Sequence, residues 1–320
     1  MTQQTDYLVD RRRLRRQLSF WRMFTFLAAG AAILAALTYY RGTDNASGRP
    51  HIARLRIEGI ITGDTTTLDL IREIAASQAR AVVLTIESPG GTTIGSEKLY
   101  EEIRLLAAKK PVVAVVGTMA ASGGYIASLG ADRVFASGNS LVGSIGVLFE
   151  YPNISKLLDT VGISYESVKS SPLKAEPNGF EPTSDAARAA LAALVDDSFS
   201  WFKALVKERR NMSEAELAAV SDGRVFTGRQ GLPLKLVDAL GGEREAIAWL
   251  EVQKGIAPAL PIHEWKRQRS FERLGLLGLA QGIMDILGLT GLGGLAQQLA
   301  EQQAVAQLDG LLVVWKVPVR

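Results

Sequence analysis

Apolar runs and helical patterns alternate along the chain between residues 51 and 255. Short runs rich in β-branched residues predict strands at residues 51–57, 81–86, 112–116, 133–136, 145–149 and 164–168. Apolar positions spaced three and four apart predict helices at residues 68–77, 94–108, 124–129, 153–161 and 185–210, the last capped by Ser184. Strands separated by crossover helices are typical of a mainly parallel, buried sheet, so the predicted fold class is α/β.

The pattern is different at the N-terminus. Residues 1–22 form a basic tail with six arginines between Arg11 and Arg22, and residues 23–40 carry no charge. A helix of that length spans roughly 27 Å, about the thickness of a hydrocarbon core. The basic tail predicts a transmembrane signal anchor at 23–40 with a cytoplasmic N-terminus and the rest of the chain across the membrane. A cleaved signal peptide fits less well because Ala36-Leu37-Thr38 is a poor cleavage site, and a buried soluble helix does not fit the basic flank.

The segments that follow the anchor divide by composition. Residues 41–50 are small and polar and are expected to be a linker, residues 51–255 form the predicted catalytic domain, and residues 256–320 form a C-terminal extension. The extension is Leu/Gly-rich at 274–299, with seven glycines between Gly275 and Gly294. Each glycine inside a helix costs about 1 kcal/mol, which disfavours a second spanning helix. Short helices on the membrane, packing on a neighbouring subunit, or a partly mobile segment all remain compatible with this composition.

The composition narrows the possible chemistry. The 320 residues include no cysteine and two histidines, His51 and His263. Disulfides, thiolate nucleophiles and cysteine-ligated metals are thereby excluded, and little is left for a histidine-rich metal centre or a Ser-His-Asp triad. No cofactor and no metal are expected. The net charge of +3 gives no reason to expect nucleic acid as a partner.

Three glycine-containing loops follow predicted strands, at residues 88–91, 120–124 and 142–146. Ligands bind at the carboxyl ends of parallel strands, where such loops lie. Ser122 directly precedes the predicted helix 124–129, where its hydroxyl would lie beside backbone N–H groups that can bind an oxyanion. The same position would also suit a simple helix cap. The loop has neither the Gly-Lys-Ser/Thr ending of a P-loop nor a Gly-x-Ser-x-Gly elbow.

A serine nucleophile requires a base. Neither histidine has catalytic-looking neighbours, whereas a lysine can act as a base if burial keeps it neutral. Lys169 and Lys174 follow a predicted strand in a loop. The alternative for each is an ordinary solvated loop lysine.

Taken in order, these motifs resemble a known family. They are Ser88-Pro-Gly-Gly91, Met119-Ala-Ala-Ser-Gly-Gly-Tyr125, Gly143-Ser-Ile-Gly146, Lys169-Ser170 with Lys174, and Asp222-Gly-Arg-Val-Phe-Thr-Gly228 followed by Leu236-Val-Asp-Ala-Leu-Gly-Gly242. The chain resembles the bacterial signal peptide peptidase A family, membrane-anchored Ser-Lys proteases, in the short form with one catalytic domain. The resemblance implies a Clp protease/crotonase-like fold with repeated ββα units, preceded here by the transmembrane helix.

The resemblance also implies the site residues. Ser122 corresponds to the nucleophile and Lys174, 52 positions later, to the general base. Gly91, with Gly90 beside it, and Gly123 correspond to oxyanion donors, and Ser144 to a residue that orients the lysine. Two departures stand out: Glu87 precedes Ser-Pro-Gly-Gly where the family has Asn, and the lysine loop reads Lys-Ser-Ser and Lys-Ala-Glu instead of Lys-Ser-Gly and Lys-Asp.

The resemblance thus predicts a serine endopeptidase that degrades residual signal peptides and similar hydrophobic peptides. It further implies a single-pass protein of the bacterial plasma membrane with an extracytoplasmic catalytic domain, and a ring-like homo-oligomer whose neighbouring subunits can complete the sites. A catalytically inactive scaffold of the same fold is one alternative, which the altered lysine loop favours. A crotonase-type enzyme acting on coenzyme A thioesters is another, but it needs neither Ser122 nor Lys174 and has no evident use for an anchor.

Overall fold

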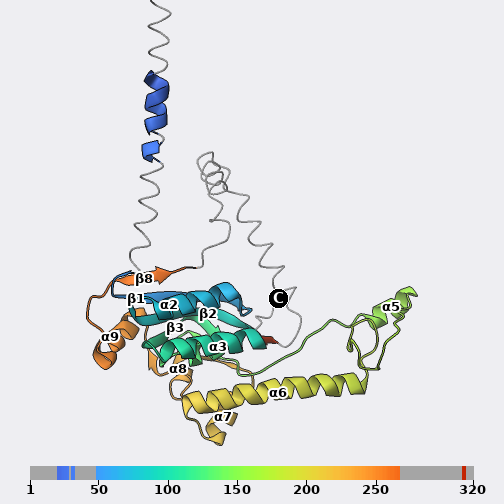
Figure 1. Cartoon of the computed structure of the whole chain (residues 1–320). Helices are drawn as coiled ribbons and strands as arrows, with labels where there is room; N and C mark the ends of the chain where they lie inside the picture. Colours follow the sequence, from blue (N-terminus) through green and yellow to red (C-terminus); the bar gives the residue numbers. More distant parts are fainter. Residues whose placement is uncertain (1–19, 29, 33–47, 267–311, 315–320) are drawn as a thin grey trace, which may run out of the picture. The chain divides into compact units, whose positions relative to one another are not determined.

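The computed structural model describes residues 20–28, 30–32, 48–266 and 312–314 (Figure 1). Residues 20–28 and 30–32 are helical, and the body of the protein begins at His51. Half of the predicted anchor 23–40 (residue 29 and residues 33–40) and the whole Leu/Gly-rich segment 274–299 lie outside the described residues. Within the described ranges, no helix has the length and hydrophobicity needed to cross a bilayer.

The described strands of the body form one sheet of nine strands with the order β6-β5-β3-β2-β1-β8; β4 pairs with β3 and with β7, and β9 pairs with β2. The strands are β1 (His51–Ile61), β2 (Ala79–Thr92), β3 (Val112–Ala121), β4 (Arg133–Ala136), β5 (Leu141–Gly143), β6 (Val225–Thr227), β7 (Ala239–Leu240), β8 (Ile262–Trp265) and β9 (Leu312–Val314). The pairs β1–β2, β2–β3, β3–β4, β3–β5, β4–β7 and β1–β8 are parallel, and β5–β6 and β2–β9 are antiparallel. The predicted mainly parallel α/β sheet is confirmed.

Helices cover both faces of the sheet. They are α2 (Thr65–Ala76), α3 (Thr93–Ala107), α4 (Gly123–Leu129), α5 (Ser155–Val161), α6 (Asp185–Arg210), α7 (Glu214–Val220), α8 (Gly228–Gly231) and α9 (Glu243–Lys254). Successive side chains of a strand point to opposite faces. Along β2, Val82 and Leu84 pack in the large core with α2, α3, α4 and α6, while Val83 packs in a second core with α9. Because both faces are covered, the buried strands are continuous apolar runs.

The longest helix was predicted with its observed bounds. α6 begins after Ser184, whose hydroxyl accepts the Ala187 N–H at 3.1 Å, and ends at Asn211, which adopts a left-handed conformation with φ 48°. A serine at the N-cap and an asparagine in the left-handed region satisfy backbone groups that the helix ends leave unpaired.

Two predicted strands are wrong. Residues 145–149 form no strand beyond an isolated bridge at Leu148, because Gly143 and Ser144 before them have φ of 94° and 53°, which ends the extended backbone of β5. Residues 164–168 form no strand within the described chain, and Val168 is fully exposed. Within the described residues, burial therefore does not account for the apolar character of the second segment.

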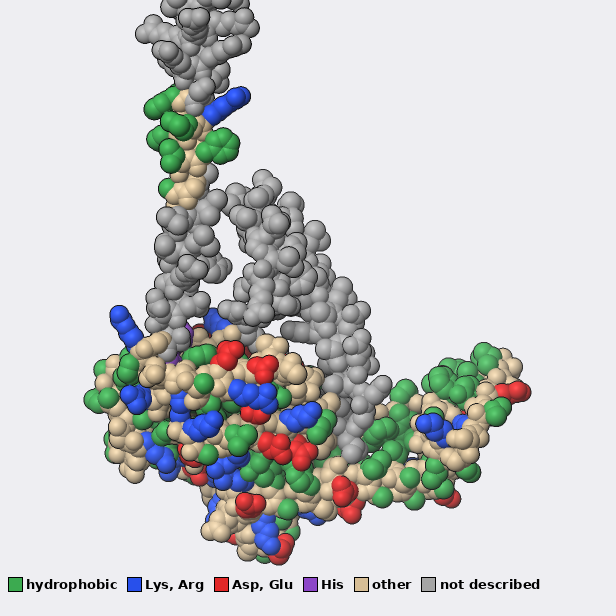
Figure 2. All heavy atoms as spheres, in the orientation of Figure 1, with side chains coloured by type: hydrophobic (Ala, Val, Ile, Leu, Met, Phe, Trp, Pro, Cys, Tyr) green, Lys and Arg blue, Asp and Glu red, His purple; other side chains and the backbone are tan. Residues whose placement is uncertain are grey.

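This second segment belongs to an arm, defined here as residues 150–183. Figure 1 shows the arm leaving the sheet and reaching α5 at the distant end of α6. Figure 2 shows hydrophobic side chains gathered over the arm. The exposed large apolar residues of the arm are Ile154, Leu157, Val161, Ile163, Tyr165, Val168, Leu173 and Phe180. Exposed apolar surfaces are common at sites of interaction.

Candidate active site

Ser122 occupies the turn between the end of β3 and the start of α4. Its backbone has φ 53° and ψ −114°, a conformation that costs a residue with a side chain about 1–3 kcal/mol. The residue is 1% exposed, and its N–H donates to the Gly143 carbonyl at 2.8 Å. Ser122 stands at the N-cap of α4, yet its side chain makes no capping hydrogen bond. The helix-cap interpretation is therefore wrong, and a strained serine at a sharp strand-to-helix turn is the arrangement typical of a nucleophile.

The predicted oxyanion glycines lie together beside Ser122. A β-carbon placed on Gly123 would lie 3.0 Å from the Gly91 nitrogen and 3.2 Å from the Gly90 Cα, so the two loops are in contact. A β-carbon placed on Gly91 would lie 1.8 Å from the Ile61 carbonyl oxygen, a distance that no side chain can adopt. Glycine is thus required at residue 91, because β1 approaches the loop there.

Ser144 is placed at the same end of the sheet as Ser122. Ala121 pairs with Gly143, and both Ser122 and Ser144 have φ 53° immediately after their strands. The Ser144 N–H donates to the Arg224 carbonyl at 2.9 Å, and β6 pairs with β5 in antiparallel register. The motif at residues 222–228 therefore holds the Ser144 loop in place.

β9 lies along the edge of β2 at the predicted oxyanion loop. Its backbone is antiparallel to β2 and pairs Gly90 with Val314, Gly91 with Val313 and Thr92 with Leu312. Upstream, β2 pairs with β3 from Val82 to Ser88. Beyond Ser88, β2 no longer pairs with β3, and its backbone pairs with the extended segment β9 instead. This pairing includes Gly91, the glycine predicted to bind the oxyanion.

Lys174 is not brought to Ser122 within the chain. It lies in a turn of the arm, where its N–H donates to the Ser171 carbonyl at 3.1 Å, and its side chain is exposed. The arm extends away from the sheet that carries Ser122 (Figure 1). The structure thus unites Ser122, Gly123, Gly90, Gly91 and Ser144 and leaves the predicted base apart from them.

Lys169, the other lysine of this loop, is engaged in ion pairs. It donates to the carboxylates of Glu176 and Glu181, the latter at 2.8 Å, and Asn178 donates to Glu181 at 2.9 Å. The hydrogen bond to Glu176 raises the pKa of Lys169, and the hydrogen bond from Lys169 lowers the pKa of Glu181 to about 2. Lys169 is therefore protonated and structural, which leaves Lys174 as the candidate base in this loop.

Two further side chains, neither of them predicted from the sequence, support the site. Ser96 on α3 is fully buried, and its hydroxyl, which donates to the Thr92 carbonyl at 2.9 Å, would lie 2.3 Å from a β-carbon on Gly123. Tyr125 on α4 is fully buried and donates to the Leu236 carbonyl at 2.9 Å, and burial raises its pKa. Tyr125 could have been found from the sequence, because it lies three residues after Ser122 on a predicted helix. Nothing in the sequence marks Ser96 as part of the site.

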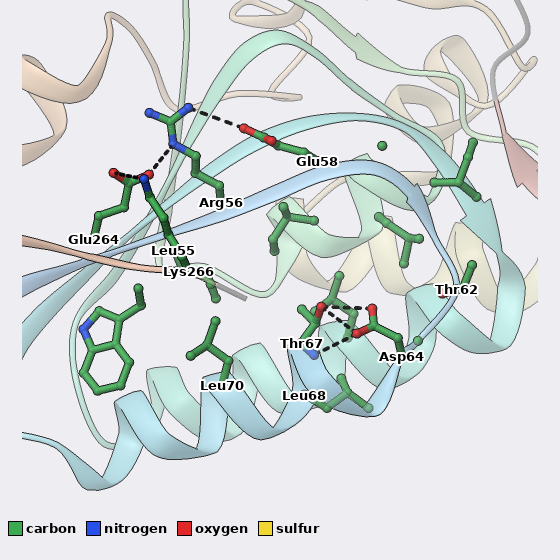
Figure 3. A pocket seen from close by; sticks show the side chains of 17 residues that line it. Leu55, Arg56, Glu58, Thr62, Asp64, Thr67, Leu68, Leu70, Glu264 and Lys266 are labelled. Atoms are coloured by element: carbon green, nitrogen blue, oxygen red, sulfur yellow. Dashed lines mark hydrogen bonds and ion pairs between the residues drawn. The ribbon is translucent and has the colours of Figure 1, made fainter. Parts of the chain in front are cut away.

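A cavity of about 630 Å³ lies between the second half of β1 and the start of α2 (Figure 3). Its rim carries Arg56, which contacts Glu264 at 3.0 Å and Glu58 at 3.4 Å. None of the predicted site residues lines this cavity. Among the described residues, no cluster of three or more His, Asp or Glu side chains could hold a metal ion.

Comparison with known proteins gives a consistent result. Residues 104–257 match the model of peptidase family S49. A Synechocystis protein named as a protease is 35% identical over 214 residues, which are 66% of this chain and 77% of that protein. The chloroplast serine protease SPPA of Arabidopsis thaliana is 29% identical over 291 residues, 83% of this chain and 42% of that protein. Protease 4 of Salmonella typhi is 32% identical over 191 residues, 59% of this chain and 31% of that protein. Among solved structures, a ClpP1 mutant from Listeria monocytogenes aligns with a TM-score of 0.41 and 13% identity, over 61% of this chain and 94% of that one.

Proposed function

Because the chain belongs to peptidase family S49 and is a serine peptidase, we propose that Ser122 is its nucleophile and Lys174 its general base. The observation that carries this proposal is the geometry of Ser122. A strained serine, hydrogen-bonded through its backbone to Gly143 and without a capping role, lies beside the loop that holds Gly91. A buried residue keeps an unfavourable backbone conformation only where the surrounding structure imposes it, and such residues cluster at active sites.

The base is proposed to come from a second copy of the chain. Lys174 is exposed in its own subunit, on an arm whose large apolar side chains are exposed as well. Docking of the arm on a neighbouring subunit would bury these side chains and bring Lys174 to the Ser122 of that neighbour. Burial would then disfavour the charged ammonium, as a lysine base requires. A closed ring of subunits, each lending its arm to the next, gives every site one serine and one lysine.

The proposed reaction is acyl transfer. Neutral Lys174 of one subunit takes the Ser122 proton of the next, and the serine oxygen attacks a peptide carbonyl. The backbone N–H groups of Gly91 and Gly123 stabilise the tetrahedral oxyanion, and losing one such donor costs about 3 kcal/mol. The protonated lysine then gives its proton to the leaving amine, and a water molecule, deprotonated by the same lysine, releases the acyl group from Ser122. Ser144, beside Gly143, is proposed to orient the lysine amine.

The proposed substrates are cleaved signal peptides and similar hydrophobic peptides. An extended peptide is expected to bind along the edge of β2 at residues 90–92, where β9 pairs in the described structure. The uncharged segment 23–40 after an arginine-rich tail supports an anchor that holds the enzyme at the membrane surface, where such peptides remain. In this proposal the tail is cytoplasmic and the catalytic domain lies on the opposite side of a bacterial plasma membrane.

Covalent labelling tests the dyad. The full-length chain is incubated with a serine-reactive fluorophosphonate probe, beside Ser122→Ala, Lys174→Ala and the surface control Ser200→Ala, and cleavage of a hydrophobic peptide is measured in parallel. We expect labelling and cleavage in the parent chain and in Ser200→Ala, and neither in Ser122→Ala. Labelling that persists in Ser122→Ala would remove Ser122 as nucleophile, and normal cleavage by Lys174→Ala would remove the lysine.

The same experiment addresses an inactive scaffold, the second candidate function. Its specific support is the altered loop around Lys174, with Ser171 and Ala175 where the family has Gly and Asp. A scaffold would neither react with the probe nor cleave the peptide in the folded parent chain.

Flotation with lipid vesicles tests the anchor. The full-length chain is expected to float with vesicles and to resist extraction at alkaline pH, because an inserted helix is held by its apolar surface. A matched variant with Leu27→Arg and Leu34→Arg within the uncharged segment is expected to remain in the soluble fraction. Equal flotation of the two proteins would contradict the anchor.

A further inference from the structure

β2 and β3 run in register until one point close to the site. Val82 to Ile86 pair one by one with Val112 to Val116, but the next pair joins Ser88 to Ala120. The pairing therefore advances two residues along β2 and four along β3, so β3 carries two additional residues as a bulge at 117–119. Such bulges redirect a strand and are common next to active sites.

A carboxylate from β2 spans this bulge. Glu87 Oε2 accepts the Thr118 N–H at 2.7 Å, and a β-carbon on Gly117 would lie 2.1 Å from the same oxygen. The carboxylate thus lies directly against the backbone of the bulge, in space that only glycine at 117 leaves open. From another direction, Ser140 Oγ donates to the Gly117 carbonyl at 2.5 Å. The bulge is held by side chains from two different segments.

The position of Glu87 connects the two halves of the proposed site. Glu87 directly precedes Ser88-Pro-Gly-Gly91, and Ser88 Oγ accepts the Gly90 N–H at 3.1 Å and donates to the Gly59 carbonyl at 2.7 Å. Thr118, whose N–H donates to Glu87, lies four positions before Ser122. One carboxylate therefore links the strand that carries the oxyanion donor to the strand that carries the nucleophile, where the two strands separate.

We propose that Glu87 is a positioning residue that fixes the placement of Ser122 relative to the Gly91 N–H. This inference rests on the proposed function of Ser122. Removing the carboxylate leaves the Thr118 N–H without its acceptor and lets the bulge relax. Because a misplacement of about 1 Å at a reacting centre can lower a rate by about a hundredfold, the effect falls on the chemical step. Glutamine retains an acceptor oxygen at the same reach and is expected to preserve the placement.

The strand offers a matched control at its opposite end. Asp132 Oδ2 accepts the Val112 N–H at 3.0 Å at the start of β3, so it makes the same kind of bond to the same strand, at the end of β3 opposite to Ser122. Asp132→Ala and Glu87→Ala each remove one carboxylate acceptor from a β3 N–H. A purely structural role for Glu87 predicts similar consequences for both variants.

The experiment compares Glu87→Ala, Glu87→Leu, Glu87→Gln, Asp132→Ala and Ser122→Ala in the full-length chain. The rate of fluorophosphonate labelling, kcat and KM for a hydrophobic peptide, and Tm are measured for each. We expect Glu87→Ala and Glu87→Leu to lower kcat and the labelling rate by about tenfold to a hundredfold with KM retained. Glu87→Gln should restore both rates, and Asp132→Ala should lower Tm while keeping them.

Three results would overturn the inference: parent-like labelling by Glu87→Ala or Glu87→Leu, no recovery in Glu87→Gln, or an equal loss of rate in Asp132→Ala. Ser122→Ala separates this inference from the proposed function. If Ser122→Ala is still labelled, the nucleophile assignment fails, and this inference fails with it. If Ser122→Ala is silent while Glu87→Ala reacts normally, the positioning role alone fails.

Discussion

Mixing two inactive variants tests whether each site is built from two subunits. Ser122→Ala removes the proposed nucleophile but keeps Lys174 on its arm, and Lys174→Ala does the reverse. Each variant alone is expected to be inactive. When both are co-expressed with different affinity tags and assemble into one oligomer, a site is complete only where a subunit with intact Ser122 receives the arm of a subunit with intact Lys174.

The expected recovery follows from the placement of the two residues. With equal amounts of the two variants and random assembly, half of the subunits have an intact serine. Half of these receive an intact lysine, so about one quarter of the sites are active, as for any ring in which one neighbour completes each site. If instead Ser122 and Lys174 of the same subunit acted together, every site in the mixture would lack one of them and no activity would return.

The assay measures hydrophobic-peptide cleavage by oligomers purified through both tags. Lys156→Ala, which removes another exposed lysine of the same arm, is the control for nonspecific damage to the arm and should retain full activity. A mixed oligomer that contains both variants and cleaves no peptide would refute the exchange of arms. Activity in Lys174→Ala alone would refute the role of the lysine itself.

Three other predictions concern a buried hydrogen bond, the exposed surface of the arm and an ion pair within the arm. Tyr125→Phe leaves a buried carbonyl without its donor and is expected to lower the free energy of unfolding by about 1–3 kcal/mol in urea titrations, and an unchanged value would contradict the role of this bond. Val168→Asp should shift the oligomer toward monomer in light scattering with helical content unchanged, because Val168 is fully exposed in the subunit; an intact oligomer would exclude this residue from the interface. The Glu181 carboxyl, whose pKa is lowered to about 2 chiefly by Lys169, stabilises the folded arm above the ordinary pKa of about 4.3, and this contribution is lost as the pH falls toward 2. A ¹³C NMR titration of Glu181 with a midpoint near 4.3 would contradict this ion pair.

The sheet and the loop of Ser122 could be predicted from the sequence because local pattern and burial agree there. Residues 112–116 and 133–136 were predicted as strands, and they are buried between helices on both faces. In a parallel sheet, the loops after successive strands lie at the same end, which is why Gly90 and Gly91 meet the loop of Ser122 and Gly123 although the two loops are distant in sequence. The fully buried Ser96 and the bulge at 117–119 were not predicted, because each depends on contacts between strands and helices that no local pattern encodes.

In the arm, the prediction from the sequence pattern was wrong. Residues 164–168 were predicted as a strand, but within the described chain this segment has no strand partner and Val168 is exposed. A buried strand face needs a second surface, and the subunit does not supply one. The same holds for Lys174, which needs burial to serve as a base yet lies exposed on this arm. Docking of the arm on a neighbouring subunit, as proposed above, would explain both discrepancies, because it would supply contacts that the described chain does not make.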